Sequence, residues 1–373
     1  MTRSALERRA REAQAWLRDA CFPLWAREGV DGSIFRENLD LNHRPIDRTD
    51  GRVRVQARQT YSFTIAYKLG WEPSKSAALV EDGVQILATQ CRRSDGLFGR
   101  RIATDGSGLT SDEADLYDTA FALFALAHAK PVVDTSDLIE ETLLSLDSHL
   151  ADPMGGYREA LPRPAYRLQN PHMHLFEACL ALFNADGNRA HLDRASRLCD
   201  LCLTRFIDPE TGTLGERFDN DWTIPNGLDG GTVEPGHHFE WVWLFAEYAK
   251  LADAEIAPQA DQLYKFACAT LDADGRAIQA TDRAGLPADA SRRTWPQTEA
   301  LKAHLLMFAR GDEAAGRLAT LSFDTLMDEY LTPEGGWIDH YSADGQVLAK
   351  SMPASTLYHI LAALNYLIDM VDP

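Results

Sequence analysis

The chain consists mostly of segments in which apolar residues recur every three or four positions, a spacing that predicts amphipathic helices. These segments are rich in Ala, Leu, Glu and Arg, which favour helix. They span residues 74–91, 116–130, 136–149, 174–184, 192–206, 239–252, 257–271, 299–308, 313–330 and 355–371. Strand-like alternation is rare, and residues 52–55 are ambiguous between strand and helix. The pattern therefore predicts an all-α protein.

A short glycine turn recurs between the predicted helices. The copies lie at residues 31–35, 95–98, 154–157, 212–215, 274–277 and 335–338. A near-constant step of roughly 60 residues is typical of a repeat architecture, and it leaves room for two helices and a loop. The sequence thus predicts six helical hairpins, which either stack as an open solenoid or close into a double-layered ring.

Each glycine turn is followed, about 20 to 27 residues later, by polar side chains that enter an apolar helix. The groups are Arg58, Tyr117 with Asp118, His174 with Glu177, His237 with Glu240, Trp295 with Glu299, and His359. The fourth group follows Pro235-Gly236, which marks a helix start, and its members are three residues apart on one helix face. In a closed ring these positions would converge at one mouth, whereas a solenoid would spread them along a groove.

Composition narrows the classes of partner. The chain has 373 residues, 45% of them hydrophobic, and a net charge of −19, which disfavours nucleic acids and anionic membranes as partners. No apolar run reaches the roughly 18 residues of a membrane span. Residues 1–18 resemble an amphipathic helix and not a signal peptide, so we expect a cytoplasmic protein. The pair Cys199 and Cys202 lies in a helical run, which we interpret as buried free thiols.

Six motifs occur in order along the chain. They are Ala57-Arg-Gln59, Leu116-Tyr-Asp-Thr-Ala-Phe121, Met173-His-Leu-Phe-Glu-Ala178, Pro235-Gly-His-His-Phe-Glu-Trp241, Trp295-Pro-Gln-Thr-Glu-Ala300 and Pro353-Ala-Ser-Thr-Leu-Tyr-His359. Together they resemble the N-acylglucosamine 2-epimerase superfamily, and within it the D-mannose isomerase branch. One departure is Thr119, where relatives often carry His.

The resemblance implies an (α/α)6 barrel, six helical hairpins in a double-layered toroid, which we expect to form one domain over residues 1–373. It implies a free monosaccharide as substrate, no metal or organic cofactor, and a monomer or homodimer. The implied reaction interconverts D-mannose and D-fructose, with D-lyxose and D-xylulose as a second candidate pair.

Such an isomerisation moves a proton between C2 and C1 through a cis-enediol or enediolate, which requires an acid and a base. Imidazole suits both roles near neutral pH. We expect His237 and His359 to be these groups, with His359 removing the C2 proton. Glu240 would orient His237 or hold a hydroxyl, Arg58 would stabilise the enediolate oxygen, and His174 would bind the ring oxygen or assist ring opening. The expected hydroxyl binders and stacking walls are Asn170, Tyr117, Asp118, Glu177, Trp295 and Glu299.

Other functions remain open at this level. A sugar 2-epimerase would begin with the same proton removal. A glycoside hydrolase would use two of the carboxylates, and a non-catalytic helical scaffold would use its groove to bind a protein. His172 and His174 resemble a metal pair, but residues two apart on a helix point to different sides.

Overall fold

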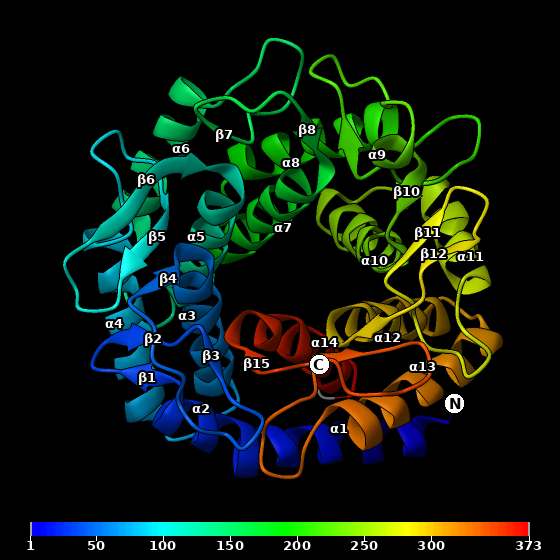
Figure 1. The fold of residues 1–373 in the computed structure, drawn as a ribbon, viewed down its shortest axis with the longest axis horizontal. Helices are drawn as coiled ribbons and strands as arrows, with labels where there is room; N and C mark the ends of the chain where they lie inside the picture. The colour runs from blue at the N-terminus through cyan, green and yellow to red at the C-terminus, as the bar shows by residue number, and fades with distance from the viewer. Residues whose placement is uncertain (1, 372–373) are drawn as a thin grey trace.

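The computed structural model describes residues 2–371, and its helices form two concentric rings around a central axis (Figure 1). The inner ring contains α3 (Val53–Lys68), α5 (Leu116–Ala129), α7 (Gln169–Asp186), α10 (Pro235–Ala252), α12 (Thr294–Ala309) and α14 (Leu357–Asp369). Each inner helix packs on the next, and α14 packs on α3, so the ring closes. The expected (α/α)6 barrel is therefore confirmed, and the open solenoid is ruled out.

The outer ring supplies one partner for each inner helix. Its members are α1 (Arg3–Trp16), α4 (Pro73–Thr89), α6 (Ser136–His149), α8 (Arg189–Leu201), α11 (Gln259–Ala269) and α13 (Glu313–Thr325). Three outer helices end in a π-helical turn, at Leu17–Cys21, Cys202–Phe206 and Leu326–Tyr330, and the first of these leads into α2 (Phe22–Glu28). Cys199 and Cys202 are buried free thiols in this layer, as interpreted. No helix within residues 2–371 has the length and hydrophobicity to cross a membrane.

The repeated glycine turns are tight hairpins that follow the outer layer. The first joins β1 (Val30–Asp31) to β2 (Ile34–Phe35), and four others are closed by single bridges, such as Arg92 with Phe98 and Leu331 with Trp337. The turns need glycine because their backbone is left-handed. At Gly335, where φ is +92°, an added Cβ would also lie 2.4 Å from the backbone of Ala20.

Short antiparallel strands join neighbouring repeats at one end of the barrel. A strand directly before each inner helix pairs with a strand of the next repeat. The pairs are β4 (Asp50–Arg52) with β5 (Gly99–Ala103), β6 (Leu109–Asp115) with β7 (Ala160–Leu161), β8 (Arg167–Leu168) with β9 (Arg217–Phe218), β10 (Thr232–Val233) with β11 (Ala280–Asp282), β13 (Arg292–Arg293) with β14 (His340–Tyr341), and β15 (Met352–Pro353) with β3 (Asn38–Leu39). Further short elements are β12 (Pro287–Asp289) and α9 (Leu228–Gly231). The last pair joins the end of the chain to its beginning, so this end of the barrel is also closed as a circle.

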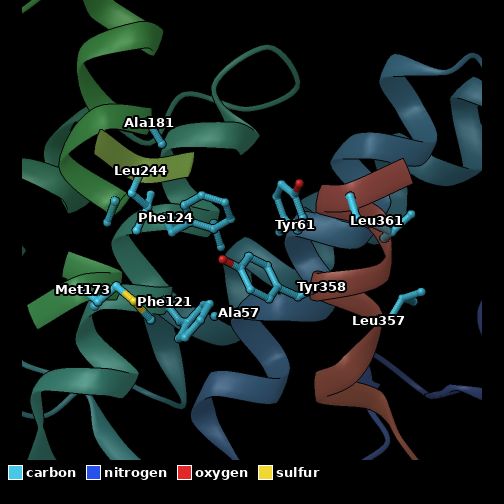
Figure 2. Close-up of a cluster of buried hydrophobic side chains, with 14 of the residues drawn as sticks. Ala57, Tyr61, Phe121, Phe124, Met173, Ala181, Leu244, Leu357, Tyr358 and Leu361 are labelled. Carbon is cyan, nitrogen blue, oxygen red and sulfur yellow. The ribbon is translucent and has the colours of Figure 1, made fainter. Parts of the chain in front are cut away.

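An aromatic cluster fills the barrel below this end. Figure 2 shows Tyr358 of α14 beside Phe121 and Phe124 of α5 and Tyr61 of α3. The Tyr358 ring centroid lies 5.1 Å from Phe121 and 5.7 Å from Tyr61, distances typical of packed aromatic pairs. Tyr61 and Phe124 also line a cavity of about 600 Å³ at the opposite end. The cluster therefore lies between the strand-lined mouth and that cavity.

The structure corrects several predicted boundaries. Three inner helices begin earlier than the apolar pattern indicates, at Gln169, Pro235 and Thr294 instead of 174, 239 and 299. The ambiguous stretch 52–55 is divided, since Arg52 ends β4 and Val53 begins α3. The reason is the same in each case: the first helical turn at the mouth carries polar residues, which interrupt the apolar periodicity.

Candidate active site

Five of the predicted site residues occupy equivalent positions in the repeats. The sixth residue of each inner segment, counted from Val53, Leu116, Gln169, Pro235, Thr294 and Ala354, points to a common layer. The sixth residues are Arg58, Phe121, His174, Glu240, Glu299 and His359. The 3-10 turn Ala354–Thr356 starts the last segment, directly before α14. Five of these six are residues that the sequence predicted to be catalytic or substrate-binding.

The fourth residue of the same segments has a structural role. His172 Nε2 accepts a hydrogen bond from the Tyr157 N–H at 3.0 Å, and its Nδ1 is 2.9 Å from the Leu168 carbonyl. His238 makes the matching contacts with Leu214 and Glu234. Burial lowers the pKa of both rings, to about 3 and about 4. Nε2 of each ring thus holds a glycine hairpin and Nδ1 contacts the carbonyl just before the ring's own helix. Both nitrogens are therefore engaged, which explains why each pair of nearby histidines contains only one site residue.

Thr119 occupies this anchoring position in the second repeat. Its hydroxyl donates to the Asp115 carbonyl at 2.8 Å, and the residue is fully buried. In two other repeats the position holds Gln56 and Gln297, each of which bonds both backbone groups of its hairpin residue. The difference from the family at Thr119 therefore falls on a residue that supports the helix start and not on the central layer.

His237 is held between a carboxylate and an amide. Its Nδ1 is 2.8 Å from Glu216 Oε2, and its Nε2 is 3.0 Å from the Asn170 side-chain nitrogen. Burial disfavours the imidazolium, but Glu216 and then Glu234 outweigh burial and raise the pKa of His237 to about 10. An imidazolium donates from both nitrogens, and the amide orientation is set by such partners. A charged His237 therefore requires the Asn170 amide to be turned so that its oxygen, which is buried without a hydrogen-bond partner among residues 2–371, takes the place of the nitrogen.

His359 has the opposite electrostatic setting. Its Nδ1 lies 2.8 Å from Glu299 Oε1, and the other oxygen of Glu299 is 2.7 Å from the Lys302 ammonium. Burial lowers the pKa of His359 well below its usual range, and the nearby Arg58 guanidinium adds to the effect. His359 is thus neutral near pH 7, whereas His237 is charged.

His174 lies between two carboxylates. Its Nδ1 is 3.3 Å from Glu177 Oε2 and 3.9 Å from Glu240 Oε1. Tyr358 also donates to Glu177. Burial lowers the pKa of His174 to about 4, and burial together with Glu299 raises the pKa of Glu240 well above its usual range. Both Glu240 oxygens are buried without a hydrogen-bond partner within residues 2–371, so they are available to a ligand hydroxyl.

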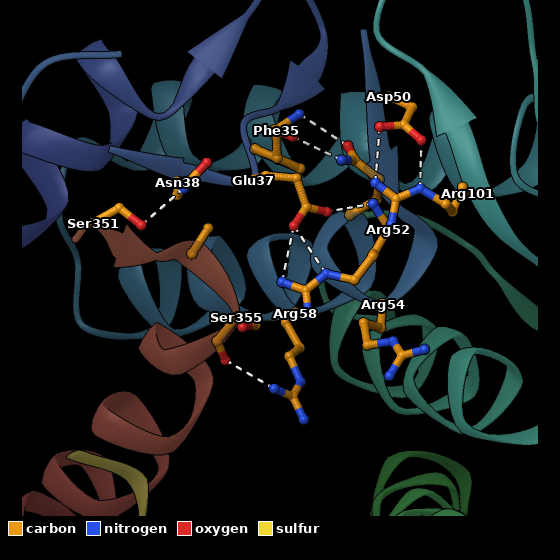
Figure 3. Close-up of polar contacts among 12 residues, drawn as sticks. Phe35, Glu37, Asn38, Asp50, Arg52, Arg54, Arg58, Arg101, Ser351 and Ser355 are labelled. Carbon is orange, nitrogen blue, oxygen red and sulfur yellow. Dashed lines mark hydrogen bonds and ion pairs between the residues drawn. The ribbon is translucent and has the colours of Figure 1, made fainter. Parts of the chain in front are cut away.

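Arg58 contributes a guanidinium to the same layer. Its Nη2 donates to the Tyr117 hydroxyl at 2.8 Å and its Nη1 to the Ser355 carbonyl at 3.0 Å (Figure 3). The guanidinium carbon lies 4.0 Å from the Phe121 ring centroid, a cation–π contact that fixes its direction. No acidic side chain within the described range pairs with Arg58, so its charge remains available.

Asp118 has a different environment from the other predicted hydroxyl binders. It is fully buried, and Arg54 binds both of its oxygens at 3.0 Å. The pair joins the start of α3 to the start of α5. Asp118 stays a predicted substrate contact, but its charge is already compensated and its oxygens are engaged.

Trp295, Tyr117 and Asn170 form the walls of the site. The Trp295 ring centroid lies 4.9 Å from the His237 ring and 5.7 Å from the His359 ring, so the two imidazoles flank one indole. Tyr117 and Asn170 line a cavity of about 280 Å³ together with Arg54, Asp115 and other residues of the mouth. Direct contacts join the predicted residues into one cluster, from Arg58 through Tyr117 to His174 and from Asn170 through His237 and Trp295 to His359 and Glu299. Glu177 also lines the cavity at the opposite end of the barrel.

Three groups of side chains bring possible metal ligands within 4.8 Å of one another. They are His174, Glu177 and Glu240; Glu216, Glu234 and His237; and Glu240, Glu299 and His359. An imidazolium has no lone pair to offer a metal, which disfavours the second group. The Lys302 ammonium already compensates the negative charge of the third group. Cofactor independence stays a prediction.

The sequence analysis missed two charged residues of this site. Glu216, which pairs with His237, directly follows the glycine turn 212–215 but precedes any helix. Lys302 is a fully buried cation three residues after Glu299, between apolar residues of α12. A lone lysine among inward-facing apolar residues was the signal that could have identified it.

Known proteins share both this fold and much of the sequence. The chain is 36% identical over 384 residues to a "Mannose-6-phosphate isomerase" of Rhizobium meliloti, covering 96% of this chain and 97% of that protein. It is 27% identical to a "D-mannose isomerase" of Thermobifida fusca, covering 82% and 80%. The crystal structure of a cellobiose 2-epimerase from Spirochaeta thermophila superimposes with a TM-score of 0.87 at 23% identity, covering 98% of this chain and 97% of that one. The family model described as N-acylglucosamine 2-epimerase matches residues 34–363, and the chain therefore belongs to the N-acylglucosamine 2-epimerase family, as the motifs predicted.

Proposed function

We propose that the protein is an aldose–ketose isomerase that interconverts free D-mannose and D-fructose. The observation that carries the proposal is the pair of imidazoles that both pack next to Trp295. His237 is held protonated by Glu216, whereas His359 is neutral because it is buried near Arg58. Two titratable groups whose pKa values are driven apart provide an acid and a base at the same pH.

In the proposed reaction, His359 Nε2 takes the proton from C2 of the open-chain aldose. The electron pair of the C2–H bond forms the C1–C2 double bond, and the carbonyl oxygen on C1 takes a proton from His237. His359 then returns its proton to C1, and His237 regains one from the C2 hydroxyl, which leaves the ketose. Arg58 stabilises the negative charge that develops on the enediolate oxygens. Glu240 and Glu299 remain near the reacting carbons as acceptors for hydroxyl groups.

The mouth supports a free sugar in preference to a sugar phosphate. Arg58 apart, the arginines beside the site are each paired with a carboxylate. The pairs are Arg52 with Glu37, Arg54 with Asp118, Arg100 with Glu113, and Arg101 with Asp50 (Figure 3 shows the first and last of these). A phosphate would have to displace these carboxylates or lie beside them, which is unfavourable. Mannose 6-phosphate is the second candidate substrate because the Rhizobium meliloti relative carries that name.

Sugar 2-epimerisation is the alternative outcome at the same site, since it differs only in where the proton returns. Incubation with D-mannose in deuterated water separates these outcomes. We expect D-fructose with deuterium at C1. D-glucose with deuterium at C2 would identify a 2-epimerase, and conversion of mannose 6-phosphate but not mannose would identify the second substrate. Mannose recovered without deuterium and without product would refute the proposal.

A further inference from the structure

Lys302 is a buried ammonium that the proposed reaction does not use. Its side chain has no exposed surface, and its Nζ lies 2.7 Å from Glu299 Oε2. The same atom lies 4.2 Å from the centroid of the Trp243 ring on α10. A lysine is almost never buried completely unless it is paired, so Lys302 and the carboxylates around it depend on one another.

Three carboxylates surround this ammonium from three helices. They are Glu177 of α7, Glu240 of α10 and Glu299 of α12, and each is less than a tenth exposed. Burial raises the pKa of Glu299, and Lys302 opposes the rise. The other titratable or charged groups that face this layer are Arg58 of α3, His174 of α7, His237 of α10, and Tyr358 and His359 of α14. Lys302 is the cation in direct contact with Glu299.

The ionisation of Glu299 decides which nitrogen of His359 is free. Glu299 Oε1 lies 2.8 Å from His359 Nδ1. An ionised carboxylate only accepts hydrogen bonds, so Nδ1 carries the ring hydrogen and Nε2 keeps its lone pair. A neutral Glu299 could donate to Nδ1 instead, which would move the ring hydrogen to Nε2 and remove the base.

We propose that Lys302 is a positioning residue that keeps Glu299 ionised and thereby holds His359 in the tautomer with a bare Nε2. The inference rests on the proposed function in one respect, because a bare Nε2 affects turnover only if His359 is the base. Lys302 touches no reacting atom and acts through Glu299.

The test compares Lys302→Met, which removes the charge at similar length, with Lys302→Arg, which keeps it. Nitrogen-15 NMR of the histidine rings in the full-length protein reports the His359 tautomer, and initial rates with mannose give kcat/KM against pH. We expect the Met variant to shift His359 toward the Nε2–H tautomer and to lose kcat by about 100-fold or more. Its kcat/KM should recover as pH rises, because Glu299 becomes ionised again. The Arg variant should keep most of the activity.

The control is His304→Gln, on the same helix and equally buried, whose ring bonds Tyr264 at 2.8 Å. It should lose stability without a change in the His359 tautomer or in the pH profile.

If Lys302→Met does not fold, Glu299→Gln removes the charge of the carboxylate in place, and this variant should lose kcat with no recovery at high pH. A folded Lys302→Met protein with the wild-type His359 tautomer would overturn the inference, as would a rate loss with an unchanged pH profile. Since the NMR measurement needs no turnover, a wild-type protein that converts no aldose would refute the proposed function and still leave Lys302 tested.

Discussion

Replacing Glu216 by Gln should move the alkaline limit of activity toward neutral pH. Glu216 Oε2 lies 2.8 Å from His237 Nδ1, and Gln keeps the shape and an acceptor oxygen while removing the charge. At 2.8 Å and an effective dielectric constant of about 20, the Coulomb attraction of the pair is about 6 kcal/mol. This value is a ceiling, because opposite charges at such distances usually shift a pKa by about 1–3 units. The His237 pKa, about 10 in the wild type, should therefore fall to about 7–9 in the variant.

The sign of the effect follows from the role of His237 as the acid. The reaction needs its protonated form, so kcat/KM is kept below the pKa of His237 and falls above it. At pH 9 about nine-tenths of wild-type His237 is protonated, whereas a pKa of about 7–9 leaves about one-hundredth to one-half, so activity should drop by about 2- to 100-fold. At pH 6 the kcat/KM values of the wild type and the variant should differ by less than about twofold.

Initial rates of fructose formation from pH 5.5 to 10.5 measure the alkaline limit of activity of the wild type and of the Glu216→Gln variant. Glu247→Gln is the control, because Glu247 is on the same helix as His237 but lines the cavity at the far end of the barrel. Its alkaline limit should equal that of the wild type. The reasoning fails if Glu216→Gln keeps an alkaline limit near 10, or if wild-type activity is already lost near pH 6.5.

Three further outcomes are expected. His359→Ala and His237→Ala should each lower kcat by about 10²- to 10⁴-fold with unchanged helical circular dichroism, and full activity in either purified variant would remove that residue from the mechanism. His172→Gln should lower the free energy of unfolding by less than about 1.5 kcal/mol, because Gln56 and Gln297 fill the same role. His172→Ala should lower it by about 2–4 kcal/mol, because the Tyr157 N–H is left unpaired. Urea titrations of the two variants measure both values. Treatment with EDTA should leave the rate with mannose unchanged, and a loss restored by a divalent cation would show that a metal is required.

The helices and their repetition could be predicted from the sequence because apolar residues recur at helical spacing and each glycine turn needs a left-handed residue. The convergence of His174, His237 and His359 could also be expected, since all three lie near the start of an inner helix and a closed ring brings those starts together. The strand pairs at the mouth could not be predicted, because β8 and β9 have only two residues each, too few for alternation to be visible. These pairs are nevertheless what fixes the start of every inner helix.

Contacts between repeats were equally hidden. Glu216 is 21 residues before His237 and belongs to a loop, so no helical spacing connects the two. Asp118 and Arg54 are each at a helix start, but only the packing of α3 against α5 places them in contact. Such ion pairs depend on the position of separate backbones, and a pattern along one segment carries no information about them.

The site can vary in chemistry without any change in the barrel because its chemical and structural roles fall on different residues of each repeat. The fourth residue of an inner segment holds the hairpin, as in His172 and Gln297, and the sixth faces the central layer, as in His174 and Glu299. Side chains on a helix tilt toward its N-terminus, so the sixth residue reaches back toward the mouth, where free N–H groups favour developing negative charge. A charge placed at the sixth position, such as that of Glu240 or Glu299, meets its counterparts from the other repeats. The base His359 is also a sixth residue, whereas the acid His237 is the third residue of its segment, and the two imidazoles differ in which carboxylate or guanidinium lies next to them.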